Sequence, residues 1–305
     1  MKRIVLILGA VLLQVAAARS EPEKTANEDL LWKKLDARVG EVVEKFDGVM
    51  GVAIVDLTDG RVILKNADRV FPTASSIKIA VLLELYHQEQ NGKAELNDAY
   101  TFDPKDLVED SQIMAGLTPG VTKVANRDLA QFMVAVSDNT AANVLIDRLG
   151  MQNVNATLHS LGLNKTMLRR KMMDIAAARR GDENVSTPLE MARLLEAIYK
   201  GKALNADLTG AIIKQLKTLK KDSWLSTELS PAVEVADKPG SLEGVRTDSG
   251  IIFAKNRVFA ISVMTAYDGD ERAAERVIGQ IGVEAFRYFD MRGKTTEYGR
   301  ILEGK

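Results

Sequence analysis

The sequence predicts an α/β fold, in which an antiparallel sheet is flanked by the N- and C-terminal helices and an all-helical lobe is inserted between the strands. Three observations lead to this fold class. Strand patterns lie near both ends of the chain, helix patterns fill the middle from about residue 90 to 225, and an amphipathic helix pattern follows the last strand pattern. Because both chain ends then belong to one lobe, we expect a cleft where the two lobes meet.

The first 18 residues have the pattern of a secretory signal peptide. Lys2 and Arg3 precede an apolar run over 4–15, and three alanines ending at Ala18 follow it. A membrane anchor is the alternative, but a run of about 15 residues is shorter than the roughly 20 that span a bilayer. We therefore expect an exported protein, periplasmic or secreted, cleaved near Ala18 and without stable membrane insertion afterwards.

The mature chain opens with a helix and a hairpin. Apolar residues recur at helical spacing over 27–46, with charges on the other face. The Val- and Ile-rich segment 49–57, the turn 58–60 and the segment 61–65 together predict an antiparallel hairpin. A second helix pattern then runs from Ser75 to about Gln90.

The rest of the chain completes the two lobes. The clearest helix patterns of the middle cover 126–136, 140–149 and 188–199. Strand patterns return at 233–236, 250–255 and 257–265, before a final helix pattern over about 270–288. We therefore expect an α/β lobe from 19–70 and 226–305 and a helical lobe from 71–225, with the active site in the cleft between them.

The composition excludes several kinds of chemistry. The 305 residues include 41 Lys and Arg against 42 Asp and Glu, a formal charge of −1, and 46% are hydrophobic, which argues against disorder and against a basic protein that coats nucleic acid. There is no cysteine, so disulfides, thiolate metal sites and a cysteine nucleophile are excluded. With only His87 and His159, a multi-histidine metal centre is not expected either. We expect no metal and no cofactor. The remaining type of nucleophile is a Ser or Thr hydroxyl activated by Lys.

One Ser-x-x-Lys pattern meets this requirement, with Ser75 and Lys78 three residues apart at a predicted helix start. Positions i and i+3 lie on one helix face, so the Lys78 amine can reach the Ser75 hydroxyl. The free backbone N–H groups and the positive dipole end of a helix N-terminus suit an oxyanion. The alternative interpretation is that Ser75 is only a helix N-cap.

Two further motifs follow in chain order. Ser137-Asp138-Asn139 lies in the helical middle, and Lys238-Pro239-Gly240-Ser241 lies on a returning strand. With Ser75 and Lys78, this set resembles the class A serine β-lactamases and their penicillin-binding relatives, and a β-lactamase-like fold is implied. The resemblance covers about the whole mature chain, and it is also carried by Phe71–Ala74, Asp106–Glu109, Thr140–Asn143, Asp182–Glu183, Thr187–Pro188 and Gly250–Ile252.

The resemblance implies a role for each motif residue. Ser75 is the nucleophile that becomes acylated, and Lys78 takes its proton, with a pKa lowered by burial and neighbouring cations. Ser137 relays a proton to the leaving nitrogen. Asn139 donates to the substrate side-chain amide and holds Lys78, and Lys238 supplies positive charge for the substrate carboxylate.

The remaining site residues belong to the same strand pair. Gly240 and Ser241 are expected to bind substrate, and the backbone N–H groups of Ser75 and Ser241 are expected to form the oxyanion hole. Arg246 is a further candidate to bind the substrate carboxylate. Asp138 is expected to be structural, capping or bracing its own loop.

Two departures from the family pattern concern the cleft walls. Pro239 stands where the family carries Thr or Ser, so a hydroxyl and its contact to a substrate carboxylate are lost. The hydroxyl of Ser241 is a possible replacement for it. Asp110 stands where a tyrosine often flanks the cleft, which removes an aromatic wall, and substrate preference is expected to differ accordingly.

A third departure concerns turnover. The family's omega loop carries a glutamate that activates the hydrolytic water, followed by Leu-Asn, but a simple alignment puts Met172 at the glutamate and Ala176 at the asparagine. Neither side chain can activate water, so Asp174 is the nearest candidate for a deacylation base. Asp182 and Glu183 are instead expected to brace the loop against Arg169 or Arg170.

The sequence therefore predicts a secreted serine β-lactamase that hydrolyses β-lactam antibiotics through a Ser75 acyl-enzyme. The alternative is a penicillin-binding, D-alanyl peptidase-like or esterase hydrolase with slow deacylation, and a silent envelope-binding domain is a third. The expected partner is a small β-lactam or peptidoglycan-like substrate, with no nucleic acid and a monomeric chain.

Overall fold

The computed structural model describes residues 26–218, 220 and 223–302. The predicted signal peptide lies outside these residues. Within the described part of the chain, no helix is both long and apolar enough to cross a membrane.

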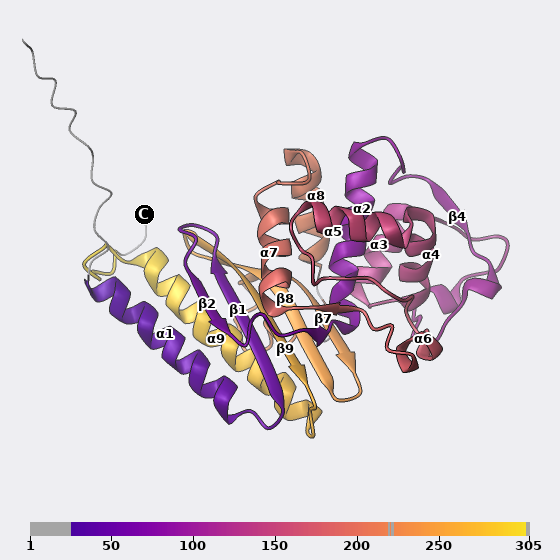
Figure 1. The fold of residues 1–305 in the computed structure, drawn as a ribbon. Coiled ribbons are helices and arrows are strands. Elements are labelled where there is room, and N and C mark those ends of the chain that lie inside the picture. The colour runs from indigo at the N-terminus through magenta and orange to yellow at the C-terminus, as the bar shows by residue number, and fades with distance from the viewer. Residues whose placement is uncertain (1–25, 219, 221–222, 303–305) are drawn as a thin grey trace, which may run out of the picture.

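A five-stranded antiparallel sheet is the centre of the α/β part, in the order β2-β1-β9-β8-β7 (Figure 1). Its strands are β1 (Val49–Asp56), β2 (Val62–Lys65), β7 (Glu234–Leu242), β8 (Val245–Ala254) and β9 (Arg257–Ala266). Both faces of β1 are buried, because Val52 and Ile54 pack in one apolar cluster while Ala53 and Val55 pack in another. The sheet is therefore covered on both sides.

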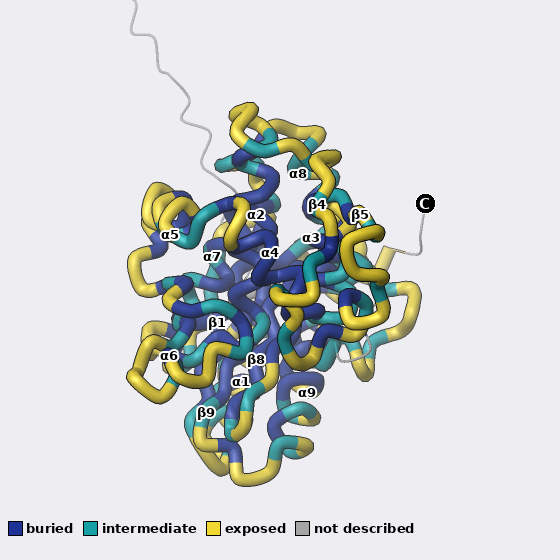
Figure 2. Tube along the Cα trace, turned by 90° about the vertical axis from the view of Figure 1, so that its right-hand side faces the viewer, coloured by how far each residue is buried: buried dark blue, intermediate teal, exposed yellow. Residues whose placement is uncertain are grey.

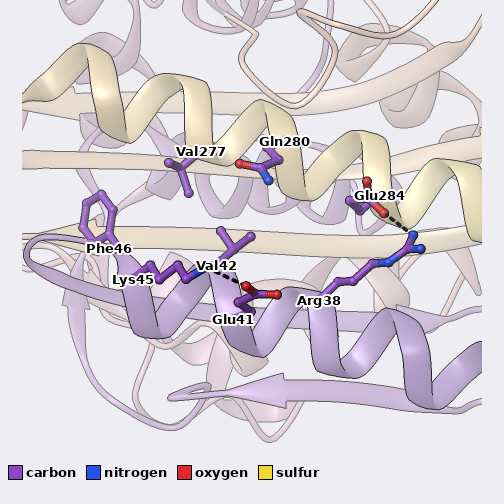
Figure 3. A pocket seen from close by; sticks show the side chains of 8 residues that line it. All are labelled: Arg38, Glu41, Val42, Lys45, Phe46, Val277, Gln280 and Glu284. Carbon is purple, nitrogen blue, oxygen red and sulfur yellow. Dashed lines mark hydrogen bonds and ion pairs between the residues drawn. The ribbon is translucent and has the colours of Figure 1, made fainter.

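The two terminal helices, α1 (Ala26–Lys45) and α9 (Glu271–Lys294), lie side by side on one face of the sheet (Figure 1). Trp32 of α1 packs edge-on against Tyr288 of α9 at 5.3 Å between ring centroids, and Phe289 stacks on Phe259 of β9 at 4.1 Å. Between the helices is a hollow of about 290 Å³ (Figure 3). The ion pair between Arg38 and Glu284 crosses it at 2.8 Å, so α1 and α9 are joined by charge as well as by the aromatic core.

The helical part covers the other face. The long central helix α2 (Lys78–Gln90) is almost wholly buried, and exposed segments lie mainly around the outside of the molecule (Figure 2). Around it are α3 (Asn126–Ala135), α4 (Asn139–Leu149), α5 (Met151–Ser160), α6 (Ile175–Arg179), α7 (Pro188–Tyr199) and α8 (Ala206–Leu216). Helix α7 begins at Pro188, and the side chain of Thr187 caps it by accepting from the Glu190 N–H. The helix packs on β1 and β9.

Two small strand pairs lie outside the main sheet. Strand β3 (Phe71–Pro72) pairs with β6 (Val185–Ser186), and β4 (Ala99–Thr101) pairs with β5 (Lys123–Ala125). The first pair ties the chain just before Ser75 to the segment before α7.

The predicted α/β class and the helical middle are confirmed, but β7 and β8 are longer than their strand patterns indicate. Asp237, Lys238 and Asp248 are buried in these strands, so polar side chains occupy positions where alternation predicts none. The lobe boundaries at 70 and 226 stay a prediction.

Helix α9 packs closely over the chain before β7. A Cβ built on Gly282 would lie 2.6 Å from the backbone carbonyl oxygen of Leu225, and one on Gly279 would lie 3.1 Å from that of Trp224. The N–H groups of the same two residues donate to the buried Asp248 carboxylate at 3.0 Å each. Glycines on one side and Asp248 on the other therefore fix the position of Trp224.

We expect Gly282→Ala to destabilise the fold by about 1–3 kcal/mol, because the added methyl group collides with backbone that is held in place. Gly210→Ala is the matched control, since Gly210 lies within α8 with open space around its Cβ position. There, alanine should stabilise by about 0.5–1 kcal/mol through helix propensity alone. Urea denaturation measures both changes, and equal effects for the two variants would contradict this packing account.

Candidate active site

Ser75 lies in a short 3-10 turn, Ala74–Ile77, that leads into α2. The N-cap of this turn is Thr73, and Ser75 lies inside the turn, so the interpretation of Ser75 as a helix N-cap is wrong. Ala74 has φ +47°, an uncommon value for a residue other than glycine. The turn is held by the buried Ser76 hydroxyl, which donates to the Lys238 carbonyl oxygen at 3.0 Å. Ser75 is thus presented at the cleft by a constrained backbone.

Lys78 follows on the first turn of α2 and is completely buried. Its ammonium donates to the Ser137 carbonyl oxygen at 2.6 Å, to Ser137 Oγ at 3.0 Å and to Asn139 Oδ1 at 2.7 Å. Burial lowers the pKa of Lys78 well below its usual value, and the nearby charge of Lys238 lowers it further, against opposing effects of Asp138 and Asp110. Burial and the charge of Lys238 both shift the equilibrium of Lys78 toward the neutral amine, the form that can accept a proton.

Ser137 connects the cationic groups with Ser75. Its hydroxyl donates to Ser75 Oγ at 2.9 Å, while Lys78 Nζ and Lys238 Nζ donate to it at 3.0 and 3.1 Å. Ser137 itself has φ +58°, so its backbone is held in the left-handed region. One hydroxyl thus lies on the path between the nucleophile and both lysines.

Asp138 explains how this backbone is held. Its Oδ1 accepts from the Ala141 N–H at 3.0 Å and caps α4, and its Oδ2 accepts from the N–H groups of Ile113 and Met114. The prediction that Asp138 is structural is confirmed. Asn139, the first residue of α4, points its side chain to Lys78.

Strand β7 forms the opposite wall of the site. Lys238 is 2% exposed, and a Cβ on Gly240 would lie 2.6 Å from the Ser75 backbone nitrogen. Only glycine permits this approach, which brings the strand against the nucleophile turn. Pro239 places its carbonyl oxygen 2.9 Å from Lys238 Nζ.

A cavity of about 280 Å³ opens beside these groups. It is lined by Ser75, Ser137, Trp224, Lys238, Pro239, Gly240, Ser241, Arg246 and Glu275. The structure therefore brings residues of all three motifs to one cleft. Trp224 and Glu275 are new members that sequence reasoning missed. Neither belongs to a motif, and the predicted C-terminal helix pattern that includes Glu275 does not indicate that this residue reaches the cleft.

Arg246 lines the cavity, but acidic groups hold its guanidinium. Nε donates to Glu275 at 2.9 Å, and Nη2 pairs with Glu271. Both Glu271 and Glu275 belong to α9. The sequence predicted Arg246 as a carboxylate-binding residue without these two partners.

The omega-loop segment differs from the rest of the site in having an apolar side chain at its centre. Met172 is buried, and Asn143 of α4 clamps its backbone, accepting from its N–H at 2.8 Å and donating to its carbonyl oxygen at 3.1 Å. Asp174, the candidate base, is exposed and caps α6 by accepting from the Ala177 N–H at 2.9 Å. Ala176 is exposed within α6.

The braces of this loop agree only partly with the prediction. Glu183 pairs with the buried Arg170 at 2.7 Å, as expected. Asp182 instead pairs with Arg180 at 3.4 Å, so its predicted contact to Arg169 or Arg170 is wrong. In the part of the chain that the structure describes, no group of three or more His, Asp or Glu side chains is arranged to hold a metal ion.

Comparisons with known proteins agree with this geometry. The model of the β-lactamase enzyme family matches residues 33–289. The β-lactamase Toho-1 of Escherichia coli is 30% identical over 241 residues, which cover 77% of this chain and 82% of that protein.

Solved structures agree as well. The ancestral (GNCA) class A β-lactamase has a TM-score of 0.78 at 27% identity and covers 84% of this chain and 100% of its own. PBP-A has the same fold, with a TM-score of 0.77 at 22% identity over 84% of this chain and 96% of its own. The chain belongs to the β-lactamase enzyme family and to the class A serine β-lactamase superfamily.

Proposed function

We propose that this protein is an exported serine hydrolase that opens β-lactam rings through an acyl-enzyme on Ser75. One observation carries the proposal, namely the hydrogen-bonded chain from Ser75 through Ser137 to Lys78 and Lys238 within the cleft. The β-lactamase relatives support the substrate class. The N-terminal pattern ending near Ala18 supports export to the periplasm or the medium.

The positions of Ser75, Ser137, Lys78 and Lys238 suggest the steps of acylation. Ser75 Oγ attacks the lactam carbonyl carbon while its proton passes to neutral Lys78 by way of Ser137, whose hydroxyl is hydrogen-bonded to both side chains. The carbonyl oxygen becomes an oxyanion that accepts from the backbone N–H groups of Ser75 and Ser241. The carbon–nitrogen bond then breaks, and Ser137 delivers a proton to the leaving nitrogen as Lys78 replaces it.

Hydrolysis of the acyl-enzyme requires a different base, and this step distinguishes the two candidate functions. Met172 has no proton acceptor, and the Asp174 carboxylate is already used as a helix cap at the surface. These features favour slow deacylation, as in a penicillin-binding or D-alanyl peptidase-like protein. Efficient turnover would require a base from another part of the chain.

Intact-mass spectrometry with penicillin G tests the proposal. We expect the mature protein to gain the mass of one penicillin on Ser75, because opening the lactam ring adds the whole molecule. Ser75→Ala should gain no mass, and Ser160→Ala, which changes an exposed serine of α5, should still be acylated. An unmodified wild-type protein that also forms no hydrolysed penicillin would refute the function.

The acylation rate should depend on pH through Lys78. Its pKa lies below the usual lysine value of about 10.4, so the rate should rise with pH through that lowered pKa and then level off. The charge of Asp110 raises the Lys78 pKa, so Asp110→Asn should move the profile toward acid. Stopped-flow acylation with a chromogenic cephalosporin measures both profiles, and a shift toward alkali would contradict the assignment.

A carboxylate at position 172 should accelerate deacylation. We expect Met172→Glu to shorten the acyl-enzyme lifetime by about 10²- to 10⁴-fold, the usual contribution of a positioned general base. Met172→Gln is the matched control, because it has a similar shape and no base, and Asp174→Ala tests the alternative base. A long-lived adduct in wild type that Asp174→Ala leaves unchanged fits the proposal, whereas a strong loss of turnover in Asp174→Ala would identify Asp174 as the base.

A further inference from the structure

The end of the cleft beyond Lys238 carries an arrangement that the catalytic groups do not use. Arg246 of β8 lies there between Glu271 and Glu275 of α9, with Trp224 beside it. The Arg246 guanidinium carbon is 5.8 Å from the centre of the Trp224 ring. Of these side chains, Trp224, Arg246 and Glu275 line the same cavity as Ser75.

The guanidinium of Arg246 is held by the protein through each of its nitrogens. Nη1 donates to the carbonyl oxygens of Leu242 and Val245 at 2.9 Å each, Nε donates to Glu275, and Nη2 donates to Glu271. A substrate carboxylate would have to displace these contacts before it could bind the fork. The arginine therefore does not offer an open site for an anion.

The carboxylates are more accessible than the cation between them. The Arg246 side chain is 8% exposed, whereas Glu275 and Glu271 are 32% and 45% exposed. Around the Arg246 guanidinium the carboxylates therefore outnumber the cation and are the more exposed groups, while Arg272 and Arg276 of the same helix border the adjoining hollow. A ligand that enters from solvent meets the carboxylates first.

Substrate chemistry places a defined group here. In a bicyclic β-lactam the carboxylate and the other substituents of the second ring are attached on the side of the lactam nitrogen. Ser137 and Lys238 mark the side of Ser75 to which that nitrogen leaves, and Trp224 and Glu275 line the same cavity. We therefore expect the second ring to extend from Lys238 toward Glu275.

We propose that Glu275, supported by Glu271, is a specificity-determining residue that selects substrates with a cationic group on the lactam-nitrogen side. This inference rests on the proposed acylation of Ser75 by β-lactams. Lys238 pairs with the substrate carboxylate, Glu275 attracts the cation further out, and the Trp224 ring offers a face for a flat cationic group. The cleft is complementary to a zwitterion.

Two cephalosporins form a matched pair of probes. Cephaloridine and cephalothin share the same thienylacetyl side chain, but cephaloridine carries a cationic pyridinium where cephalothin carries a neutral acetoxy group. The measured quantity is the ratio of their second-order acylation rate constants, obtained by stopped-flow absorbance and intact mass. This ratio is defined whether or not the acyl-enzyme turns over.

We expect the wild-type protein to prefer cephaloridine and Glu275→Gln to lower the ratio about fivefold, in keeping with the loss of one partly exposed charge. The glutamine side-chain oxygen can still accept from Arg246 Nε, so the hydrogen bond between α9 and β8 is preserved. Glu275→Asp keeps the charge and should keep the preference. Glu284→Gln changes an acid of the same helix that pairs with Arg38, and should leave the ratio unchanged.

The outcomes separate the two proposals. If both probes acylate Ser75 and Glu275→Gln leaves their ratio as in wild type, the role of Glu275 is wrong while the proposed function stands. An equal fall in Glu284→Gln would also overturn it, because the effect would then belong to the general charge of α9. If neither probe acylates Ser75, the proposed function fails and the role of Glu275 fails with it.

Discussion

The buried ammonium of Lys78 is the interaction on which the rest of the site depends. A cation with no exposed surface is stable only when hydrogen-bond acceptors surround it or when it gives up its proton. Lys78 has both possibilities, because Ser137 and Asn139 supply three acceptors while burial and Lys238 lower its pKa. The same acceptors that hold the amine also connect it with Ser75.

The fold serves this arrangement by bringing three distant segments together. Helix α2 carries Lys78, the start of α4 carries Asn139, and β7 brings Lys238 against the nucleophile turn. Each junction depends on a local device. Asp138 holds the left-handed backbone of Ser137, and Gly240 allows the strand to approach the Ser75 nitrogen. Loss of either would separate groups that the chemistry needs within hydrogen-bond distance.

Much of this site could be predicted from the sequence. The residues that could not be predicted were missed for one shared physical reason. Ser75, Lys78, Ser137 and Lys238 stand in short motifs, so type and spacing identify them. Trp224 and Glu275 reach the cleft only because α9 packs over the chain before β7, a tertiary contact with no local pattern. Arg246 was recognised by its charge, but its partners on α9 decide what that charge does.

The secondary structure shows the same division. Helix α1, the hairpin and α7 have clear periodicity, and their bounds in the structure are close to the predicted ones. The final helix is confirmed as well, but α9 runs on to Lys294, beyond the predicted end near residue 288. Strands β7 and β8 extend beyond their predicted bounds, and the buried Asp237 and Asp248 within them are the reason that the apolar pattern is too short. Asp237 pairs with Lys220 at 3.0 Å, and burial beside Asp237 raises the pKa of Asp248 well above its usual value. Buried polar groups of this kind interrupt the apolar pattern from which strands are predicted.

The protonation state of Lys78 is the central claim, and an NMR titration of the resting enzyme tests it most directly. Protein labelled with carbon-13 at the lysine ε-carbons gives one signal per lysine, and the Lys78 signal is the one absent from Lys78→Arg. The account predicts that this signal titrates well below the usual lysine pKa of about 10.4, and clearly below the exposed lysines of the same sample. A Lys78 signal that titrates together with those exposed lysines would contradict the account, because Lys78 would then be a cation at neutral pH and no base for Ser75.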